Sequence, residues 1–461
     1  MLFIFVLREY AELHLKSYSL KKSMLSCPLT KRVSLQWGLR RRLHSTSSSQ
    51  APLESLPAAQ LEYWRKVPSW RDITETQFLD YKWQMKNSLQ NASSLFAFLE
   101  STVPSTIPLA NGQATTREDF IADVKAGLQH APMATRLTPH ILSLIGWNDP
   151  YSDPIRRQFI PLASGFQQDH PRLQLDSLSE SRDSPVKGLV HRYPDKVLFL
   201  ATSVCPVYCR FCTRSYSVGM KTETVTKKRF LPLRKYWEPM FDYIAQTPTV
   251  TDVVVSGGDT FYLEPAQLRE IGQELLKIRN VRRIRFASKG LSRAGEEARE
   301  ERSTAHAFNH PQEISWVTER AAQTLFQNAV TVRNQTVLLN GVNNDVDTMK
   351  WLIRRLADNN IQPYYVYQGD MVQGVEDLRT PLRDIIHIVS HVRGTIAGFM
   401  TPSFVVDLPG GGGKRLAATF ESYDKNTGVS RFVAPGVKGS TVHEYHDPLW
   451  SLPGYTETRQ I

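Results

Sequence analysis

The chain has 461 residues, of which 41% are hydrophobic and 22% are charged, and its formal net charge is +11. This apolar content excludes a chain that is disordered throughout, and no run of about 18 apolar residues predicts a membrane span. Four cysteines are too few for a secreted protein stabilised by disulfides. The length is sufficient for one large catalytic region with a smaller companion.

The positive charge is concentrated at the N-terminus. Residues 1–50 contain nine Lys and Arg against two Glu, so they contribute +7 and leave +4 for the rest of the chain. No acidic residue occurs from Leu13 to Leu53, and the leader is rich in Arg and Ser. This composition predicts a mitochondrial transit peptide over residues 1–44 and a location in the matrix. Met24 begins a more typical leader than Met1, and a disordered basic arm that binds RNA or lipid is the alternative interpretation.

The elements expected further along the chain change in character near Lys196. Residues 58–110 are rich in Trp, Lys and Gln and predict helices, and Pro132–Ser181 predicts a polar connection with short helices. Apolar, β-branched runs then predict strands at Val197–Thr202, Val250–Val255, Arg283–Ser288, Val330–Leu339, Pro363–Tyr367 and Ser403–Val406. Amphipathic segments between them predict helices at Pro265–Ile278, Gln312–Gln327, Asp345–Asp358 and Pro381–Val392. Residues 442–461 are interpreted as a polar tail.

Alternating strands and helices are typical of an α/β fold with a parallel sheet, closed or partly closed as a barrel. Such a sheet carries its chemistry on loops at the C-terminal ends of the strands. We therefore expect an N-terminal helical region and connection at 45–190, a catalytic core at 191–415 and a C-terminal extension at 416–461.

Three cysteines form a CxxxCxxC motif directly after the strand that ends near Thr202: Cys205, Cys209 and Cys212. Three thiolates on one loop can bind three irons of a 4Fe–4S cluster and leave the fourth iron open. The only other cysteine, Cys27, falls in the leader. An open iron can be chelated by S-adenosylmethionine, and the motif resembles that of the radical S-adenosylmethionine superfamily. Buried structural thiols or a zinc knuckle are the alternatives, although zinc needs a fourth ligand.

A second motif ends the next predicted strand and consists of Ser256, Gly257, Gly258 and Asp259. Glycines let the backbone approach a ligand, and exposed N–H groups can bind its polar groups. Alone, the motif is equally typical of a turn between a strand and a helix. In the superfamily that the cysteines resemble, a similar motif binds the amino group of S-adenosylmethionine, so these four residues are predicted to bind that cofactor.

A third motif consists of four glycines, 410–413, followed by Lys414. A lysine fixed beyond such a run can form a Schiff base with pyridoxal 5'-phosphate, although the run alone is more typical of a flexible turn. Upstream, Arg192 can bind a phosphate and Tyr193 can stack on a pyridine ring. Singly, these two residues are ordinary surface residues.

Taken together and in this order, the motifs are similar to those of the lysine 2,3-aminomutase family, from about Tyr81 to Lys414. The resemblance implies a partial (β/α) barrel of the radical S-adenosylmethionine type. It implies cluster ligands at Cys205, Cys209 and Cys212, a catalytic and cofactor-binding lysine at Lys414, and further cofactor-binding residues at Arg192, Tyr193, Lys196 and Gln335. It also implies that Arg214 binds the substrate carboxylate and that Asp370 and Asp407 bind a remote ammonium group.

The activity that this resemblance implies is an isomerisation of L-lysine to β-lysine, in which a 5'-deoxyadenosyl radical and pyridoxal phosphate move the amino group. One guanidinium and two carboxylates suit a diamino acid, which leaves arginine and ornithine as alternative substrates. A related radical aminomutase acting on another amino acid or on a protein-bound lysine, and a catalytically impaired cofactor-binding descendant, are further alternatives.

The expected partners follow from the same chemistry. An electron donor such as a ferredoxin or a flavodoxin-type reductase is required, and a homo-oligomer is a further option. No nucleic acid partner is expected, because the body of the chain lacks a basic stripe with interleaved aromatics. No membrane partner is expected either.

The chain departs from the family pattern in three places. Lys289–Ser303 is a shorter, charged connection than the family has, and a crossover between parallel strands needs at least 10–12 residues. Loss of an exon from the gene model, a tolerated short crossover and an impaired protein are the three explanations. Ala307 and Phe211 stand where the family commonly has histidine. No cysteine remains for structural zinc, so zinc is not expected.

Overall fold

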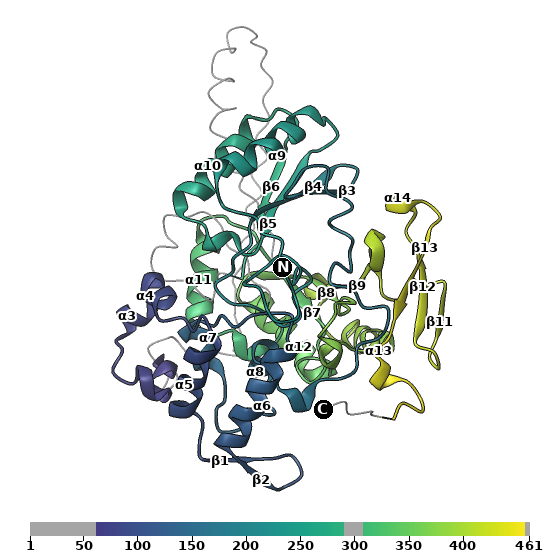
Figure 1. Ribbon diagram of the computed structural model, residues 1–461. Helices are drawn as coiled ribbons and strands as arrows, with labels where there is room; N and C mark the ends of the chain where they lie inside the picture. The colour runs from purple at the N-terminus through teal and green to yellow at the C-terminus, as the bar shows by residue number, and fades with distance from the viewer. Residues whose placement is uncertain (1–60, 290–307, 457–461) are drawn as a thin grey trace, which may run out of the picture.

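A computed structural model describes residues 61–289 and 308–456 of the chain (Figure 1). Among these residues no helix combines the length and the apolar character needed to cross a membrane. The predicted transit peptide, most of Lys289–Ser303 and Ala307 lie outside the described residues, so the expectations about them stay predictions.

The first of two central sheets has the order β3-β4-β5-β6. Strands β4 (Lys196–Thr202), β5 (Asp252–Gly257) and β6 (Arg283–Phe286) are parallel, as predicted. Strand β3 (Leu189–Tyr193) was not predicted and pairs antiparallel with β4. The short chain between them makes this hairpin possible, because antiparallel neighbours need no crossover.

The second sheet has the order β10-β9-β8-β7. Strands β7 (Val332–Val337), β8 (Ile361–Tyr367) and β9 (Ser403–Leu408) are parallel. Strand β10 (Gly413–Leu416) folds back antiparallel on β9 and was not predicted either. The two sheets confirm the α/β class. Among the described residues β6 and β7 do not pair, so closure of the sheets into one partial barrel stays a prediction.

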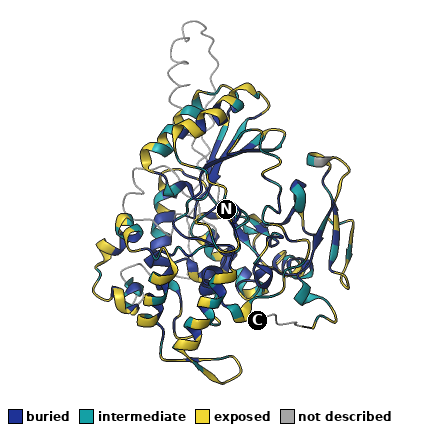
Figure 2. Cartoon of the chain, viewed as in Figure 1, coloured by how far each residue is buried: buried dark blue, intermediate teal, exposed yellow. Residues whose placement is uncertain are grey.

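Helices cover the outer sides of the two sheets (Figure 1). On the first sheet, α9 (Arg234–Gln246) and α10 (Pro265–Lys277) bury Trp237 and Ile271 against strand residues such as Val253. Figure 2 shows the inner strands as buried and the outward helix faces as exposed. The remaining helices of this region are α11 (Trp316–Gln327), α12 (Val346–Asp358) and α13 (Leu382–Val392). The four predicted helices are thus confirmed, with ends within a few residues of prediction.

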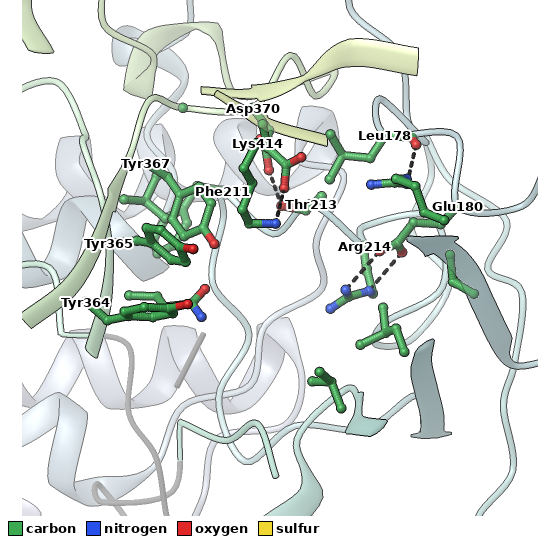
Figure 3. A pocket seen from close by; sticks show the side chains of 18 of the residues that line it. Leu178, Glu180, Phe211, Thr213, Arg214, Tyr364, Tyr365, Tyr367, Asp370 and Lys414 are labelled. Carbon is green, nitrogen blue, oxygen red and sulfur yellow. Dashed lines mark hydrogen bonds and ion pairs between the residues drawn. The ribbon is translucent and has the colours of Figure 1, made fainter. Parts of the chain in front are cut away.

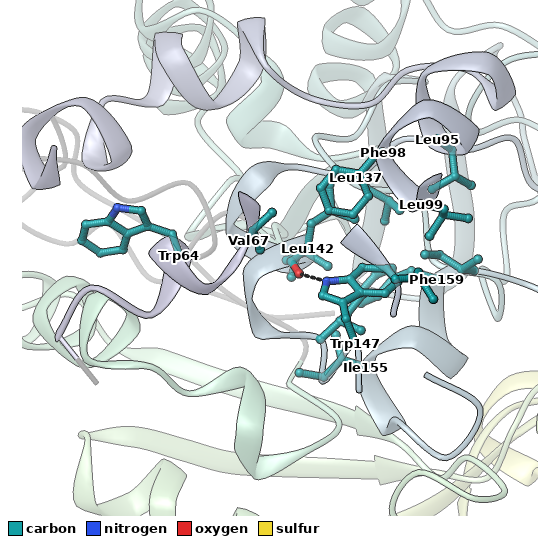
Figure 4. Close-up of a cluster of buried hydrophobic side chains, with 14 of the residues drawn as sticks. Trp64, Val67, Leu95, Phe98, Leu99, Leu137, Leu142, Trp147, Ile155 and Phe159 are labelled. Atoms are coloured by element: carbon teal, nitrogen blue, oxygen red, sulfur yellow. Dashed lines mark hydrogen bonds between the residues drawn. The ribbon is translucent and has the colours of Figure 1, made fainter. Parts of the chain in front are cut away.

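The N-terminal part of the described chain packs around tryptophans. Its elements are the 3₁₀ helices η2 (Tyr63–Lys66) and η3 (Pro68–Trp70), the helices α3 (Glu75–Leu79), α4 (Tyr81–Lys86), α5 (Ala92–Thr102), α6 (Arg117–His130), α7 (Pro139–Leu144) and α8 (Pro154–Phe159), and the hairpin β1 (Thr106–Pro108) and β2 (Ala114–Thr116). Figure 4 shows Trp147 among Phe98 and Leu99 of α5, with its indole N–H donated to the Leu142 carbonyl at 3.0 Å. The helices expected over 58–110 therefore form where that range is described.

The interpretation of residues 442–461 as a polar tail is wrong for their described part, 442–456. Strand β13 (Val442–His446) completes an antiparallel sheet with β11 (Ser422–Asp424) and β12 (Val429–Val433). The side chains of His443, Tyr445 and His446 are buried, whereas Val442 is exposed, so polar residues make up much of the buried side of this strand. Tyr445 is fully buried and donates its hydroxyl to the Gly369 carbonyl at 2.8 Å.

Candidate active site

A cavity of about 200 Å³ lies between the two central sheets. Each of the eight strands β3–β10 contributes at least one residue to its lining. The loop that carries the three cysteines, Ser203–Arg214 (the cysteine loop), contributes Phe211, Thr213 and Arg214. Eight of the predicted site residues line it together: Arg192, Tyr193, Lys196, Arg214, Gln335, Asp370, Asp407 and Lys414. The structure thus brings residues that are more than 200 positions apart in the sequence into one pocket.

Lys414 lies inside this pocket and forms an ion pair with Asp407. The two residues are partners in the β9–β10 register, and Lys414 Nζ lies 2.8 Å from Asp407 Oδ2. Burial alone would lower the pKa of Lys414, but the Asp407 carboxylate raises it well above its ordinary value. Conversely, Lys414 and Arg192 outweigh burial and lower the pKa of Asp407. The rings of Tyr193 and Tyr367 lie 5.9 and 5.5 Å from Nζ, so aromatic surface surrounds the amine.

Asp370 supplies a second carboxylate to the same pocket. Thr213 donates its hydroxyl to Asp370 Oδ2 (Figure 3). Burial, reinforced by the negative charge of Asp407, raises the pKa of Asp370 to about 7. The Oδ1 atoms of Asp370 and Asp407 are both buried without a hydrogen-bond partner. Both residues line the cavity, and each keeps a carboxylate oxygen that could accept a hydrogen bond from an ammonium group.

Arg214 makes a bidentate ion pair with Glu180, which we did not predict. Its Nε lies 2.8 Å from Glu180 Oε2 and its Nη2 lies 2.9 Å from Oε1. Tyr216 donates its hydroxyl to the same carboxylate at 2.9 Å. Burial alone would lower the pKa of Arg214, but Glu180 outweighs it, so the guanidinium stays charged. Figure 3 shows this pair on one side of the pocket, apart from Asp370 and Lys414.

Positive charge gathers at the β3–β4–β6 side of the cavity, where an anion could bind. Arg192 donates to Asp183 Oδ2 at 3.0 Å and to the Leu178 carbonyl, and Arg285 lies in an ion pair with Asp252. Lys196 has no ion-pair partner among the described residues, and its Nζ lies 3.8 Å from the Tyr193 ring centroid. Burial and the neighbouring Lys414 and Arg285 lower its pKa to about 8. A phosphate beside Lys196 would relieve this repulsion, which fits the predicted pyridoxal phosphate.

The three cysteines lie on one loop, Ser203–Arg214, and all three are half-buried. Burial raises all three pKa values, that of Cys209 to about 12, while Lys289 acts in the opposite direction on Cys209. No three His, Cys, Asp or Glu side chains of the described residues converge as ligands of one metal ion. A 4Fe–4S cluster takes one thiolate per iron, so three thiols spread along one loop are a donor set for a cluster whose fourth iron is open.

The glycine motif 256–259 braces the cysteine loop. Gly258 donates its N–H to the Thr202 carbonyl at 2.5 Å, and Asp259 donates to the Val204 carbonyl at 2.9 Å. A Cβ atom on Gly258 would lie 2.6 Å from the Val204 nitrogen, so only glycine fits there. The expectation that these two N–H groups are exposed is wrong, because both are used within the protein. Whether the rest of the motif binds S-adenosylmethionine stays a prediction.

The carboxylate of Asp259 is also engaged by its surroundings. It accepts hydrogen bonds from the Ser288 hydroxyl at 2.6 Å, from the Phe261 N–H at 2.8 Å and from the Lys289 N–H. Asp259 therefore joins the end of β5 to the chain that follows β6. One of its partners, Lys289, is the first residue of the connection Lys289–Ser303. The described chain resumes at Phe308, whose N–H is donated to Asn334 Oδ1 of β7 at 2.8 Å.

Several pocket residues escaped the sequence reasoning. Glu180 comes from an irregular polar segment that matches no motif, and Arg285 and Tyr365 come from strands that were read only as buried elements. Phe211, noted as a departure from the family, lines the pocket. An unusual run of aromatic residues at Tyr364–Tyr367 was the one signal that could have pointed to a cavity-facing strand.

Comparison with known proteins identifies relatives that are similar to this chain over most of its length. No protein-family model matches the chain. The L-lysine 2,3-aminomutase of Clostridium subterminale is 34% identical over 400 residues, which is 85% of this chain and 89% of the relative. The L-lysine 2,3-aminomutase of Fusobacterium nucleatum subsp. nucleatum is 36% identical over 353 residues, 74% of this chain and 77% of the relative. The glutamate 2,3-aminomutase of Clostridioides difficile is 29% identical over 360 residues, 76% and 79%.

These relatives are amino acid 2,3-aminomutases, and the pocket, with its lysine, acid pair and adjacent cysteine loop, has the residues of that enzyme class. The chain belongs to the lysine 2,3-aminomutase family of radical S-adenosylmethionine proteins.

Proposed function

We propose that this protein converts L-lysine to β-lysine, using a 4Fe–4S cluster, S-adenosylmethionine and pyridoxal 5'-phosphate. The observation that carries the proposal is the pocket itself, in which Lys414 lies beside two carboxylates while an arginine lies apart from them. A free diamino acid has a carboxylate for one end of this pocket and an ammonium group for the other. Asp370 and Asp407 argue against glutamate, whose second carboxylate they would repel.

The residues of the chain have distinct roles in this proposal. Arg214 binds the substrate carboxylate, and Asp370 and Asp407 bind its ε-ammonium group. Lys414 attaches pyridoxal phosphate, whose ring delocalises the unpaired electron during migration of the amino group. Cys205, Cys209 and Cys212 bind the cluster, which together with S-adenosylmethionine supplies the hydrogen-abstracting radical.

Hydrogen bonds and strand pairing hold the cysteine loop and Lys414 in position. The Gly258–Thr202 and Asp259–Val204 hydrogen bonds fix the cysteine loop against β5, and the β9–β10 register fixes Lys414 against Asp407. A preorganised, water-poor pocket favours reactions whose partners must stay aligned. We also propose that the two central sheets are halves of one partial (β/α) barrel, since all eight of their strands line the same cavity.

The location in the mitochondrial matrix is a separate proposal, which rests on the Arg- and Ser-rich, acid-poor composition of residues 1–44. Incubation of the radiolabelled full chain with energised mitochondria tests it. Import with loss of the leader supports the location, and failure to be imported contradicts it.

Anaerobic reconstitution of the full chain with iron, sulfide and pyridoxal phosphate tests the enzymatic proposal. We expect β-lysine to form after addition of S-adenosylmethionine, dithionite and L-lysine, as detected by mass spectrometry after chiral derivatisation. Ornithine, arginine, glutamate and a lysine-containing peptide in parallel assays test the alternative substrates. Loading of both cofactors without turnover of any of them would indicate the catalytically impaired descendant and contradict the proposal.

A further inference from the structure

A strongly basic segment follows the cysteine loop directly. Residues 219–236 contain six Lys and Arg and one Glu, a balance of +5, whereas the whole of residues 51–461 has a balance of only +4. Outside this segment, the body of the chain is therefore close to neutral. We call residues 219–236 the basic segment. Its concentration of charge is a feature that the sequence analysis did not single out.

Most of the cations in the basic segment face solvent. Lys221, Lys228, Arg229 and Lys235 are exposed and form no ion pair among the described residues. Arg234 differs, because Glu238, Glu270 and Glu274 surround it. Uncompensated charges on one short stretch of surface produce a positive local field that attracts acidic partners.

Apolar side chains lie exposed among these cations. Met220 is 56% and Leu233 is 49% exposed, and Leu231 and Tyr236 are exposed as well. Large apolar side chains inside a charged rim are typical of surfaces that contact another protein. Leu231, Lys235 and Tyr236 also line a small cavity at this surface.

The basic segment is attached to both ends of the cysteine loop. Ser203, at its start, donates its N–H to the Phe230 carbonyl at 3.0 Å, and its hydroxyl accepts the Phe230 N–H at 2.8 Å. Just beyond its end, the Tyr216 carbonyl accepts the Lys228 N–H at 2.9 Å, and the Ser215 carbonyl accepts the Lys227 ammonium. A protein seated on the basic segment would therefore be separated from the residues that flank the cysteine loop only by a segment that is hydrogen-bonded to them.

We propose that the basic segment is the docking surface for an acidic one-electron carrier protein of the ferredoxin or flavodoxin type. The inference rests on the proposed function, which needs one electron at the cluster for each radical formed. Docking transfers one electron, which oxidises the reduced carrier by one electron and reduces the cluster by one. The positive field speeds encounter with an acidic carrier, and the exposed apolar residues give short-range contact.

RNA and anionic membranes are attracted by positive charge too. The position of the segment favours a redox partner, because its backbone hydrogen bonds lead to Ser203 and Tyr216, which flank the three cysteines. Nucleic-acid surfaces also interleave cations with several exposed aromatic rings, and Tyr236 is the only exposed aromatic residue of this segment.

The test uses the reconstituted holoenzyme and the variant Lys221→Glu/Arg229→Glu/Lys235→Glu. Its matched control is Lys82→Glu/Lys86→Glu/Lys125→Glu, which makes the same charge change at exposed residues of α4 and α6. Stopped-flow spectroscopy follows reduction of the cluster by a reduced flavodoxin or ferredoxin at increasing salt. Reduction by dithionite needs no docking and is measured for every variant.

We expect the triple variant to lower the second-order rate constant with the carrier on the order of tenfold or more at low salt and to flatten its salt dependence. The control variant and all dithionite rates should be unchanged. Equal carrier rates for the triple variant and the control would overturn the inference. So would tighter binding of single-stranded RNA or of phosphatidylserine vesicles than of the carrier.

Two further results keep the interpretation unambiguous. If the triple variant does not fold, the single variant Arg229→Glu replaces it, with Lys125→Glu as its control and a smaller decrease expected. A wild-type holoenzyme that dithionite reduces but that makes no β-lysine would refute the proposed function alone. A productive enzyme whose reduction by the carrier ignores the basic segment would refute only the docking surface.

Discussion

The guanidinium of Arg214 and the carboxylate of Glu180 meet edge to edge inside the pocket, with both of their contacts at 2.8–2.9 Å. Tyr216 donates to the same carboxylate, so Glu180 is restrained from two sides. The arginine is therefore oriented before any substrate arrives, and its charge is balanced while the pocket is empty. In the proposed function a substrate carboxylate would share this guanidinium with Glu180, and Glu180 would then be a positioning residue.

The variant Glu180→Gln tests that role. The glutamine keeps the size of the side chain but loses a charge-assisted bidentate contact worth about 1.5–3 kcal/mol. We expect the KM for lysine to rise about tenfold or more, with a smaller change in kcat. Steady-state kinetics of β-lysine formation measure both constants.

Two further measurements distinguish a loss of positioning from a general structural defect. Glu100→Gln, on the exposed surface of α5, serves as a control and should leave both constants unchanged. In the Glu180 variant, the preference for lysine over lysinamide should shrink as well, because that preference depends on an oriented Arg214. An equal fall of kcat for both substrates without a change in KM would contradict the positioning role.

The raised pKa of Asp370 makes substrate binding depend on pH. With a pKa of about 7, the carboxyl is protonated in the empty pocket below neutrality and cannot pair with an ammonium group. We expect kcat/KM for lysine to rise between about pH 6 and 8 as this group ionises. The variant Asp370→Asn should lower kcat/KM and flatten that part of the pH profile.

Asp370 also affects stability, with the sign opposite to that of a stabilised carboxylate. The unfolded carboxyl has a pKa of about 4, so between about pH 4 and 7 the folded state binds more protons than the unfolded state. The contribution of this group to stability therefore falls as pH rises through that window. Thermal melting should show a larger gain in Tm for Asp370→Asn at pH 8 than at pH 5. A gain that is independent of pH would contradict the shifted pKa.

Lys414 and Asp407 allow cofactor attachment to be separated from stability. Lys414→Ala should abolish the visible absorbance of bound pyridoxal phosphate while leaving that of the cluster. It also leaves Asp407 buried without its cation, which costs on the order of 3–5 kcal/mol. The double variant Lys414→Ala/Asp407→Asn should recover most of this stability but not the cofactor absorbance. Covalently retained cofactor in either variant would exclude Lys414 as the attachment site.

The parallel strands were predictable because each is a compact apolar run between amphipathic segments. Buried on both faces, β5 needs only Val and small residues, and its pattern is therefore unambiguous. The antiparallel strands β3, β10 and β13 were missed because they are rich in polar residues. Arg192 and Lys414 face the cavity, and His443 is buried in spite of its polarity. In such strands the hydrophobic pattern does not indicate a β-strand, and the strand forms because it pairs with a neighbouring strand.

The candidate site was predictable only where a motif fixes local chemistry. Lys414 and the cysteines have distinctive spacing, and the resemblance to a known family added the acids. Glu180 has no such mark, because its importance comes from Arg214, 34 residues away, and not from its own surroundings in the chain. The N–H groups of Gly258 and Asp259 were misjudged for a related reason, since the sequence does not show that the cysteine loop passes within hydrogen-bond distance.

The contact between the glycine motif and the cysteine loop gives a final prediction. A methyl group at position 258 would meet the backbone of Val204, which cannot move aside as a flexible side chain could. Gly258→Ala should therefore displace the cysteine loop, lower the amount of iron and sulfide bound per chain, and destabilise the fold by about 1–3 kcal/mol. Gly272, on α10, is the matched control because a Cβ atom there would meet nothing within 4 Å.

In the control, alanine replaces glycine inside a helix and should raise stability by up to about 1 kcal/mol. Chemical denaturation and iron analysis after reconstitution measure the two effects separately. If Gly258→Ala bound a full cluster and unfolded at the same denaturant concentration as the wild type, the close approach of the two loops would not be required. Loss of the cluster from Gly258→Ala but not from Gly272→Ala would instead show that the glycine motif supports the cluster ligands, apart from any role in binding S-adenosylmethionine.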